Sequence, residues 1–300
     1  MYLGIDTSCY TTSVAAVCGS VAADERILLK VKEGERGLRQ SEGVFQHIKN
    51  LPLITEQIVG IFPNIKAIGV SAAPRREEGS YMPVFLVGRS FAKTLSHALG
   101  VPLIETSHQE GHIAAAAADS GFDDEHRFIA VHISGGTSEI VLCEKDKTGY
   151  ETKIIGGTLD LPAGQLIDRI GVAAGENFPC GRTMQKKAAE TELRLPVTVR
   201  GCGFHLSGAE TKAMSYIGKI PKEEIYKAVF MCIAESLGKA LENAAAEYNT
   251  SKILLAGGVS ANKYIREYLS KIPGICFSNP LYSTDNAVGT AYICERVCNL

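Results

Sequence analysis

Short apolar runs alternate with longer amphipathic runs along this chain, a pattern that predicts an α/β protein. The first part begins with three strand-like runs joined by short polar turns. Two amphipathic helices then alternate with two further strands. The expected elements are the strands Leu3–Ser8, Thr12–Cys18 and Arg26–Lys32, the helix Ser41–Gln57, the strand Ala67–Ala72, the helix Val84–Leu99 and the strand Pro102–Glu105.

The same order of elements begins again at residue 128. The expected elements are the strands Phe128–Ile133, Ser138–Cys143 and Tyr150–Ile155, the helix Glu223–Tyr248, the strand Lys252–Ala256, the helix Ala261–Leu269, the strand Ile275–Phe277 and the helix Asn286–Val297. Two copies of strand-strand-strand-helix-strand-helix indicate a duplicated α/β unit. This order resembles the actin-like superfamily of sugar kinases and heat-shock ATPases, which implies two lobes with a nucleotide in the cleft between them.

Composition and charge narrow the function classes. The chain has 300 residues, of which 45% are hydrophobic and 21% charged, and this suits one large or two medium domains. No apolar segment approaches the ~20 residues that a membrane span needs, so we expect a soluble protein that is not exported. Nine cysteines without a CxxC pair indicate free thiols in a reducing cytoplasm. A net charge of −2 gives no global attraction for nucleic acid, so an RNA partner requires local patches or a helper protein.

Two histidines in the stretch Ser107–Ile113 form a candidate metal site. His108 and His112 are four residues apart, so on a helix they differ by only about 40° of rotation and can bind one ion. The alanines of residues 114–118 favour that helix. Glu110 lies roughly 200° round the helix from His108 and points away from the metal, which argues against a zincin peptidase. The alternative is a surface helix with two unconnected histidines.

Glycine-rich or polar turns at strand ends are candidate phosphate sites, because backbone N–H groups can approach an anion there without a side chain in the way. Four such turns are Asp6–Ser8, Ser134–Thr137, Gly156–Thr158 and Gly257–Ser260. The last is the strongest, since an apolar strand leads into it and a helix is expected from about Ala261. Each turn alone is as consistent with a plain connection. Four in a duplicated sheet predict a nucleotide cleft.

Three further polar residues have a functional and a structural interpretation. Asp168, in the segment Ala163–Val172, either accepts hydrogen bonds from ribose hydroxyls or is a solvated charge paired with Arg169. Asp285 either caps the last helix, as Thr284 also could, or completes a two-histidine, one-carboxylate metal set typical of non-haem iron. His132 is either a core residue or a further ligand.

Taken in order, these motifs resemble the tRNA threonylcarbamoyladenosine transferase family, formerly labelled O-sialoglycoprotein endopeptidase (peptidase M22-like), with this chain a divergent member. The resemblance covers nearly the whole chain. Its motifs are Leu3–Cys9, His108-x-x-x-His112, Ile133–Gly136, Gly157–Asp160, Ala163-Gly164, Ile167-Asp168, Phe204-x-Leu206-Ser207-Gly208, Gly257–Asn262 and Thr284–Ala287.

The resemblance implies one divalent metal ion, iron or zinc, bound by His108, His112 and Asp285. His132 stands where some members place a metal-binding tyrosine, so it is a less certain fourth ligand. The resemblance also implies an adenylate or ATP-type ligand in the cleft. Its expected binding residues are Ile133, Ser134, Gly135, Gly136, Thr137, Asp168, Gly181 and Asn262.

The implied reaction is metal-dependent transfer of a threonylcarbamoyl group from threonylcarbamoyl-AMP to an adenosine beside the tRNA anticodon. No side chain is assigned as a nucleophile, because the donor already carries a good leaving group and positioning supplies much of the catalysis. The implied partners are tRNA, a smaller homologous dimer partner and an ATPase subunit. No membrane is involved.

Three departures from bacterial members leave alternatives open. Thr137-Ser138 replaces a His and a Thr, Ala73-Pro74-Arg75 replaces a Gly-Pro-Gly loop, and Thr11 or its neighbour replaces an acidic residue. One alternative is a non-catalytic paralogue that serves as scaffold or regulator. Another is an actin-like ATPase or kinase, with Asp6 or Asp168 as base or magnesium ligand. For each of these functions we expect an N-terminal lobe (residues 1–106), a metal-binding helix with its connection (107–127) and a C-terminal lobe (128–300).

Overall fold

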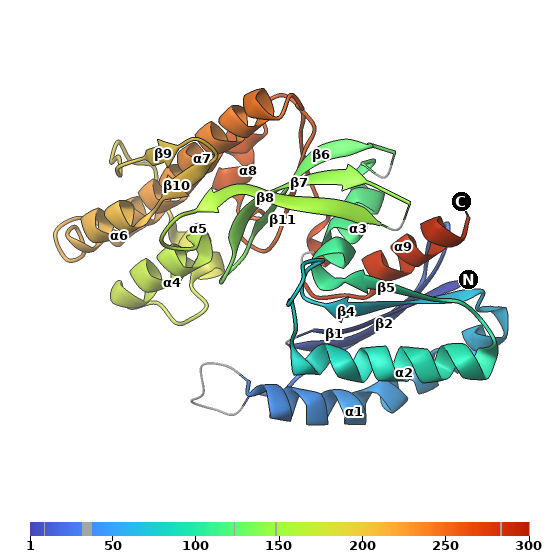
Figure 1. Cartoon of the computed structure of the whole chain (residues 1–300). Coiled ribbons are helices and arrows are strands. Elements are labelled where there is room, and N and C mark those ends of the chain that lie inside the picture. The colour runs from blue at the N-terminus through green and yellow to red at the C-terminus, as the bar shows by residue number, and fades with distance from the viewer. Residues whose placement is uncertain (9, 32–37, 123, 148, 283, 300) are drawn as a thin grey trace. The chain divides into compact units, whose positions relative to one another are not determined.

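The computed structural model describes residues 1–300 except 9, 32–37, 123, 148, 283 and 300. Its residues divide by contacts into two compact units (Figure 1). Unit 1 comprises Met1–Asp124, Lys145–Thr152 and Leu281–Leu300, and unit 2 comprises Glu125–Glu144 and Lys153–Pro280. These units differ from the expected lobes mainly at the C-terminus, because the last helix packs on the sheet of unit 1.

Unit 1 is built on a five-stranded sheet with the order β3-β2-β1-β4-β5. The strands are β1 (Tyr2–Ser8), β2 (Thr11–Cys18), β3 (Ser20–Leu28), β4 (Ala67–Ala73) and β5 (Leu103–Ser107). The first three are antiparallel, and β4 pairs in parallel with β1 and β5. The third strand begins earlier than the predicted Arg26, because Gly19, with φ of 69°, turns the chain at once into a tight hairpin. Lys32, the predicted end, lies outside the described residues.

Helices cover both faces of this sheet, which is why all seven residues of β1 are buried. The pair α1 (Gln40–Gln57) and α2 (Pro83–Leu99) covers one face, and the 3₁₀ turn η1 (Val59–Asn64) directly follows α1 in the chain. The helix α9 (Val288–Cys298) covers the other face and also contacts α3 (His108–Ser120). Gly4 allows this approach, since a Cβ there would lie 2.3 Å from the carbonyl oxygen of Ala287.

Unit 2 contains a seven-stranded sheet with the order β12-β11-β6-β7-β8-β10-β9. The strands are β6 (Arg127–Ile133), β7 (Ser138–Lys145), β8 (Tyr150–Thr158), β9 (Thr198–Arg200), β10 (Gly203–His205), β11 (Ile253–Ala256) and β12 (Ile275–Phe277). The five strands β8-β7-β6-β11-β12 repeat the order β3-β2-β1-β4-β5, so the predicted duplication is confirmed.

An insertion between β8 and β11 enlarges unit 2. The helices of unit 2 are α4 (Ala163–Ala173), α5 (Gly181–Lys187), α6 (Ser207–Met214) and α7 (Lys222–Glu247) before β11 and α8 (Lys263–Leu269) after it, with the 3₁₀ turn η2 (Pro280–Tyr282) next to the unit boundary. The core of the unit surrounds α7, of which fourteen residues are buried. The sequence did not predict α5, α6, β9 and β10, because elements of three to eight residues carry too little periodicity.

Two composition-based expectations bear on the environment of the protein. The cysteines that the structure describes are free thiols, as predicted. Among the described helices, none combines the length and the apolar character needed to cross a membrane.

Candidate metal and nucleotide sites

The helix that carries both histidines starts at a fixed point. Ser107 is its N-cap: the Ser107 hydroxyl accepts a hydrogen bond from the N–H of Glu110 (3.2 Å), and the Glu110 carboxylate accepts one from the N–H of Ser107 (2.9 Å). This capping box begins the helix at His108. Glu110 is buried in the box and also accepts a hydrogen bond from the N–H of Tyr150. It is therefore engaged away from the histidines, as its helical phase predicts.

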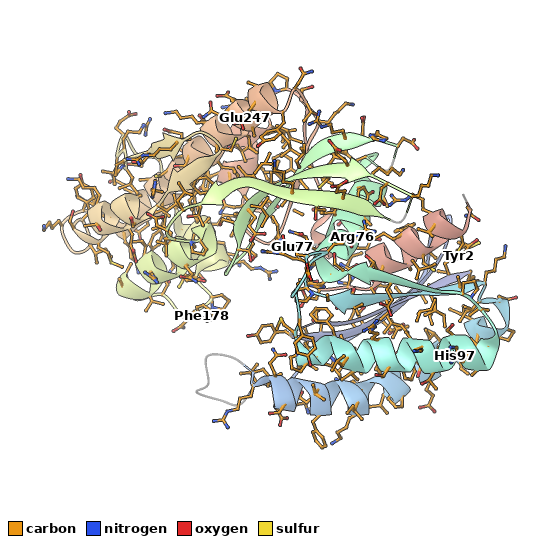
Figure 2. All side chains as sticks on the ribbon, viewed as in Figure 1. Tyr2, Arg76, Glu77, His97, Phe178 and Glu247 are labelled. Carbon is orange, nitrogen blue, oxygen red and sulfur yellow. The ribbon has the colours of Figure 1, made fainter. Side chains whose placement is uncertain are left out.

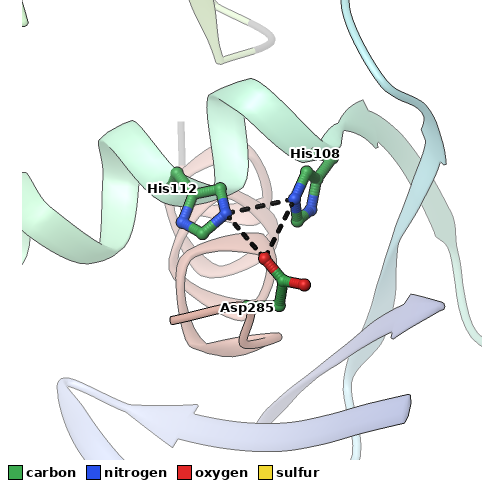
Figure 3. Close-up of side chains that lie close together, drawn as sticks. All are labelled: His108, His112 and Asp285. Atoms are coloured by element: carbon green, nitrogen blue, oxygen red, sulfur yellow. Dashed lines mark hydrogen bonds and ion pairs between the residues drawn. The ribbon is translucent and has the colours of Figure 1, made fainter. Parts of the chain in front are cut away.

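Three ligand atoms converge in unit 1 (Figure 3). The two Nε2 atoms of His108 and His112 are 3.1 Å apart, and Oδ1 of Asp285 lies 3.5 and 3.3 Å from them. Metal–ligand bonds of about 2.1 Å would separate neighbouring donors by about 3.0 Å in octahedral and about 3.4 Å in tetrahedral geometry. The observed separations fall within or close to this range, so the three side chains fit one small divalent ion without rearrangement.

The close packing of α9 against α3 brings Asp285 to the histidines. A Cβ at Gly289 would lie 1.8 Å from the carbonyl oxygen of Gly111, so glycine is required at this crossing. Of the two interpretations of Asp285, the one in which Thr284 or Asp285 caps the last helix is wrong. The N-cap is Ala287, and Asn286 accepts the hydrogen bond from the N–H of Val288 (3.0 Å). Asp285 is thus free of a capping role.

The sequence analysis did not predict that the buried carboxylate of Asp6 is the hydrogen-bond partner of His108. Oδ2 of Asp6 lies 2.8 Å from Nδ1 of His108, and Oδ1 accepts a hydrogen bond from the N–H of Ser8 (2.9 Å). A carboxylate can only accept, so Nδ1 of His108 carries the proton and its Nε2 faces His112 and Asp285. The signal in the sequence was a single acid within an otherwise apolar strand.

The charges of this cluster shift its pKa values. Burial alone would raise the pKa of Asp6, but the charge and hydrogen bond of His108 outweigh it and hold the pKa below its usual value. Burial disfavours the charged form of His108, yet Asp6 and Asp285 raise its pKa well above the usual value. Asp285 is also partly desolvated, but both histidines lower its pKa. Without metal, the cluster therefore holds a proton that a metal must displace.

His132 belongs to a different unit of the chain from His108, His112 and Asp285. It is in β6 of unit 2, paired with Glu139 of β7 and with Ala256 of β11. The three-residue group found among the described side chains does not include it. Its role as a fourth ligand stays a prediction.

The Ser134–Thr137 turn of unit 2 offers open backbone. The N–H of Ser134 bonds to the carbonyl of Thr137 (2.8 Å), and the Ser134 hydroxyl accepts from the N–H of Thr137 (3.2 Å). A Cβ added to Gly135 or Gly136 would meet no atom within 4 Å. On its other side the turn rests on α4, because a Cβ at Gly164 would lie 2.5 Å from both the Ser134 carbonyl oxygen and the Gly135 Cα. The turn is therefore fixed from one side and accessible from the other.

Another of the four predicted turns, Gly257–Ser260, packs beside the Ser134–Thr137 turn. The N–H of Val259 bonds to the carbonyl of Ile133 (3.1 Å), which joins the Gly257–Ser260 turn to the end of β6. The following helix begins at Lys263 rather than Ala261, because Asn262 is its N-cap and accepts from the N–H of Tyr264 (3.0 Å). In this structure the side-chain oxygen of Asn262 thus binds its own helix.

Asp168 fixes the start of α5. Its Oδ1 accepts a hydrogen bond from the N–H of Cys180 (2.8 Å), directly before Gly181. The alternative interpretation, an ion pair with Arg169, is wrong: Arg169 pairs with Glu210 instead (3.1 Å). Asp168 and Gly181 are thus brought together, as two residues of one ligand site require.

The Asp160 carboxylate, to which the sequence analysis gave no role, links two loops of unit 2. Asp160 accepts hydrogen bonds from the backbone N–H groups of Leu206 (2.8 Å) and Ser207 (3.2 Å) at the start of α6. Desolvation opposes ionisation, but these bonds and the Ser207 hydroxyl lower the pKa of Asp160 to about 2. Asp160 therefore ties the loop after β8 to the loop after β10.

Known proteins resemble this chain over most of its length. A family model described as tRNA N6-adenosine threonylcarbamoyltransferase matches residues 43–292. The tRNA N6-adenosine threonylcarbamoyltransferase of Thermosipho africanus (strain TCF52B) is 30% identical, over 90% of this chain and 84% of its own. The protein of the same name from Neorickettsia sennetsu (strain ATCC VR-367 / Miyayama) is 30% identical, over 97% and 92%.

Solved structures of low identity share the fold. Full-length HypF in a phosphate- and nucleotide-bound form superposes with a TM-score of 0.67 at 13% identity, over 99% of this chain and 46% of HypF. A ROK family glucokinase from Streptomyces griseus in complex with glucose and AMPPNP gives 0.54 at 9% identity, over 98% and 99%. These likenesses confirm the predicted actin-like, sugar-kinase type of fold.

Proposed function

The chain belongs to the family of tRNA N6-adenosine threonylcarbamoyltransferases, and from this premise we propose that it transfers a threonylcarbamoyl group from threonylcarbamoyl-AMP to an adenosine beside the tRNA anticodon. In this reaction N6 of the adenosine forms a bond to the carbamoyl carbon. The bond from that carbon to the phosphate oxygen of AMP breaks, AMP leaves, and N6 loses a proton. Neither the scaffold nor the ATPase alternative gains support from the named relatives.

The convergence of two imidazole nitrogens and one carboxylate oxygen carries the metal proposal. His108, His112 and Asp285 would hold one divalent ion, with iron or zinc as the candidates for such a mixed donor set. A bound ion would supply a Lewis acid that orients and polarises the donor. Asp6 keeps the proton of His108 on Nδ1, and His132 is proposed as a weaker, fourth ligand.

The open turn of unit 2 supports an adenylate site. Backbone N–H groups at Gly135 and Gly136 suit an anion such as phosphate, because no side chain stands in the way there. Asp168 would accept hydrogen bonds from ribose hydroxyls. The full set proposed to contact the adenylate or ATP-type ligand is Ile133, Ser134, Gly135, Gly136, Thr137, Asp168, Gly181 and Asn262.

We extend the proposal to the protein partners and the cellular location. The resemblance implies a smaller homologous dimer partner and an ATPase subunit, and the free thiols fit a reducing cytoplasm. An apolar groove of about 570 Å³ between α1 and α2, lined by Ile48, Leu86 and Phe91 among others, supports a protein partner on unit 1. In unit 2 the helix α7 corresponds to α1, but there the inserted helices α4, α5 and α6 pack against it.

Reconstitution tests the function directly. The protein is incubated with the synthetase that makes threonylcarbamoyl-adenylate, threonine, bicarbonate, ATP, unmodified tRNA and the candidate partner subunits, and the modified nucleoside is measured by mass spectrometry. Wild-type protein should form it. The variants His108→Ala and Asp285→Ala should lose bound metal and at least about 100-fold in rate, equivalent to ~2.7 kcal/mol.

A matched control is His97→Ala, which removes an exposed imidazole from α2 of the same unit (labelled in Figure 2). This variant should keep both metal and activity. Retention of the metal in His108→Ala and Asp285→Ala alike would show that the ligand set is wrong. Absence of product from the wild type with all partners present would contradict the transferase proposal.

A further inference from the structure

An aromatic side chain is exposed on the loop between α4 and α5 of unit 2. Phe178 is 74% exposed, the largest exposed fraction among the big hydrophobic side chains that the structure describes. Figure 2 labels it at the edge of the unit. Burial of a phenylalanine stabilises a fold, so the loop forgoes that stabilisation by turning this ring to solvent.

The loop is anchored on the N-terminal side of Phe178. The N–H of Glu176 bonds to the carbonyl of Gly171 (2.9 Å). The Glu176 side chain, only 5% exposed, accepts bonds from the ammonium groups of Lys187 (2.7 Å) and Lys222 (2.8 Å) and from the hydroxyl of Tyr226 (2.8 Å). Ion pairs to α5 and α7 thus hold the chain two residues before the ring.

The loop is anchored equally on the C-terminal side. Cys180 is fully buried, and its N–H bonds to Oδ1 of Asp168 (2.8 Å). Its side chain fills the space that only a glycine at position 171 leaves open, since a Cβ there would lie 2.3 Å from the Cβ of Cys180. Phe178 therefore projects from backbone that is held two residues to either side, so the ring is presented without a large ordering cost.

The neighbours of this ring indicate what it binds. Asp168 and Gly181, both proposed to contact the adenylate, hold or begin the segment that follows it. Arg182 and Lys186 on α5 are exposed and can meet phosphate charge. An exposed aromatic side chain on a held loop, followed in the chain by exposed cations, is an arrangement by which proteins stack unpaired bases.

We propose that Phe178 is a stacking platform for a nucleobase, a role that rests on the proposed function. The base is either the adenine of the adenylate or an unstacked base of the tRNA, and these two sources share the same ring chemistry. Stacking of one base on an aromatic side chain corresponds to about 5- to 150-fold in affinity.

The test uses Phe178→Ala, Phe178→Leu and Phe178→Tyr in the full chain. AMP binding is titrated on the protein alone, and KM for unmodified tRNA is measured in the reconstituted reaction. Alanine and leucine should weaken one of these ligands about 5- to 150-fold, while tyrosine keeps the affinity within about 3-fold. A weaker AMP complex assigns the adenylate, and a higher KM with unchanged AMP binding assigns the tRNA.

Ribose 5-phosphate, which lacks a base, should bind all variants equally, and Val172→Ala, which trims an exposed side chain on α4, should change nothing. The proposal is overturned if alanine leaves both ligands unaffected, if leucine binds as well as wild type, or if ribose 5-phosphate weakens in parallel with AMP. The AMP titration needs no turnover, so a wild-type protein without transferase activity would refute the proposed function and still leave this test intact. Because the ring is exposed, the variants should unfold at the wild-type temperature.

Discussion

Replacing Asp6 with asparagine tests how the fold prepares His108 for a metal. The aspartate accepts two hydrogen bonds, one from Nδ1 of His108 and one from the N–H of Ser8. Asparagine has the same shape but only one carbonyl oxygen. If that oxygen stays with Ser8, the amide NH₂ faces the imidazole and favours the tautomer whose proton is on Nε2. That tautomer cannot bind a metal through Nε2.

The expected loss of zinc affinity can be estimated from the hydrogen bond between Asp6 and His108. It is a 2.8 Å hydrogen bond to a carboxylate that is 1% exposed, so solvent screens it little. Hydrogen bonds to charged groups contribute about 1.5–3 kcal/mol, and loss of such a carboxylate behind a ligand histidine lowers metal affinity about 10- to 100-fold. Asp6→Asn should therefore bind zinc at least about tenfold more weakly than wild type.

The assay is a zinc titration against a competing chelator, with thermal unfolding to check that the variant is folded. Asp160→Asn is the matched control, because Asp160 is likewise a carboxylate that accepts backbone hydrogen bonds but lies in unit 2. It should leave zinc affinity unchanged. Equal zinc affinity in wild type and folded Asp6→Asn would refute the role given to this carboxylate.

Three further predictions follow from the packing and the pKa values. Gly164→Ala should destabilise the fold by about 1–3 kcal/mol and weaken AMP binding, since its Cβ would overlap backbone of Gly135. Gly60→Ala is the control, because a Cβ at Gly60 would meet no atom within 4 Å. Equal unfolding temperatures of Gly164→Ala and wild type would contradict the prediction. Glu176→Gln should lower stability at pH 7 by about 1–2 kcal/mol, because hydrogen bonds from two lysines and a tyrosine hold the pKa of Glu176 at about 2. Wild type should lose that contribution as pH falls from about 4.5 towards 2, whereas the variant should lack this step in acid titrations followed by circular dichroism. Zinc affinity should fall as pH falls through the raised pKa of His108, because protonation removes the ligand lone pair; a pH-independent affinity would argue against ligation by His108.

The relation between His108 and His112 could be predicted from sequence because it is local. Helical rise and rotation alone place the two imidazoles on one face, and the capping box at Ser107 sets where the helix begins. The same rotation predicted that Glu110 turns away. The duplicated order of strands and helices along the chain could also be predicted, because period and run length identify buried strands without knowledge of their partners.

The identification of Asp285 as the third proposed metal ligand needed the resemblance and then the fold. Nothing near Asp285 in sequence distinguishes a ligand from a helix cap, and the cap proved to be Ala287. Its distance to the histidines depends on how closely α9 crosses α3, which Gly289 decides through a contact with Gly111.

Several polar side chains received their partners only in three dimensions. Arg169 follows Asp168 in the chain but pairs with Glu210, while Asp168 binds the N–H of Cys180. Asp160 joins the loop after β8 to the loop after β10, whereas the sequence shows only that each loop contains a motif. Hydrogen-bond partners of this kind depend on which loops the packed sheet brings together, so no local pattern encodes them.

By itself the sequence determined what repeats at short range: the α/β alternation, its duplication and the paired imidazoles on one helix face. The tertiary structure alone decided which carboxylate stands behind His108 and where the last helix packs. Rotation per residue is set by the backbone and can be read from spacing, whereas contacts between distant segments depend on the packing of whole elements and appear only when the chain has folded.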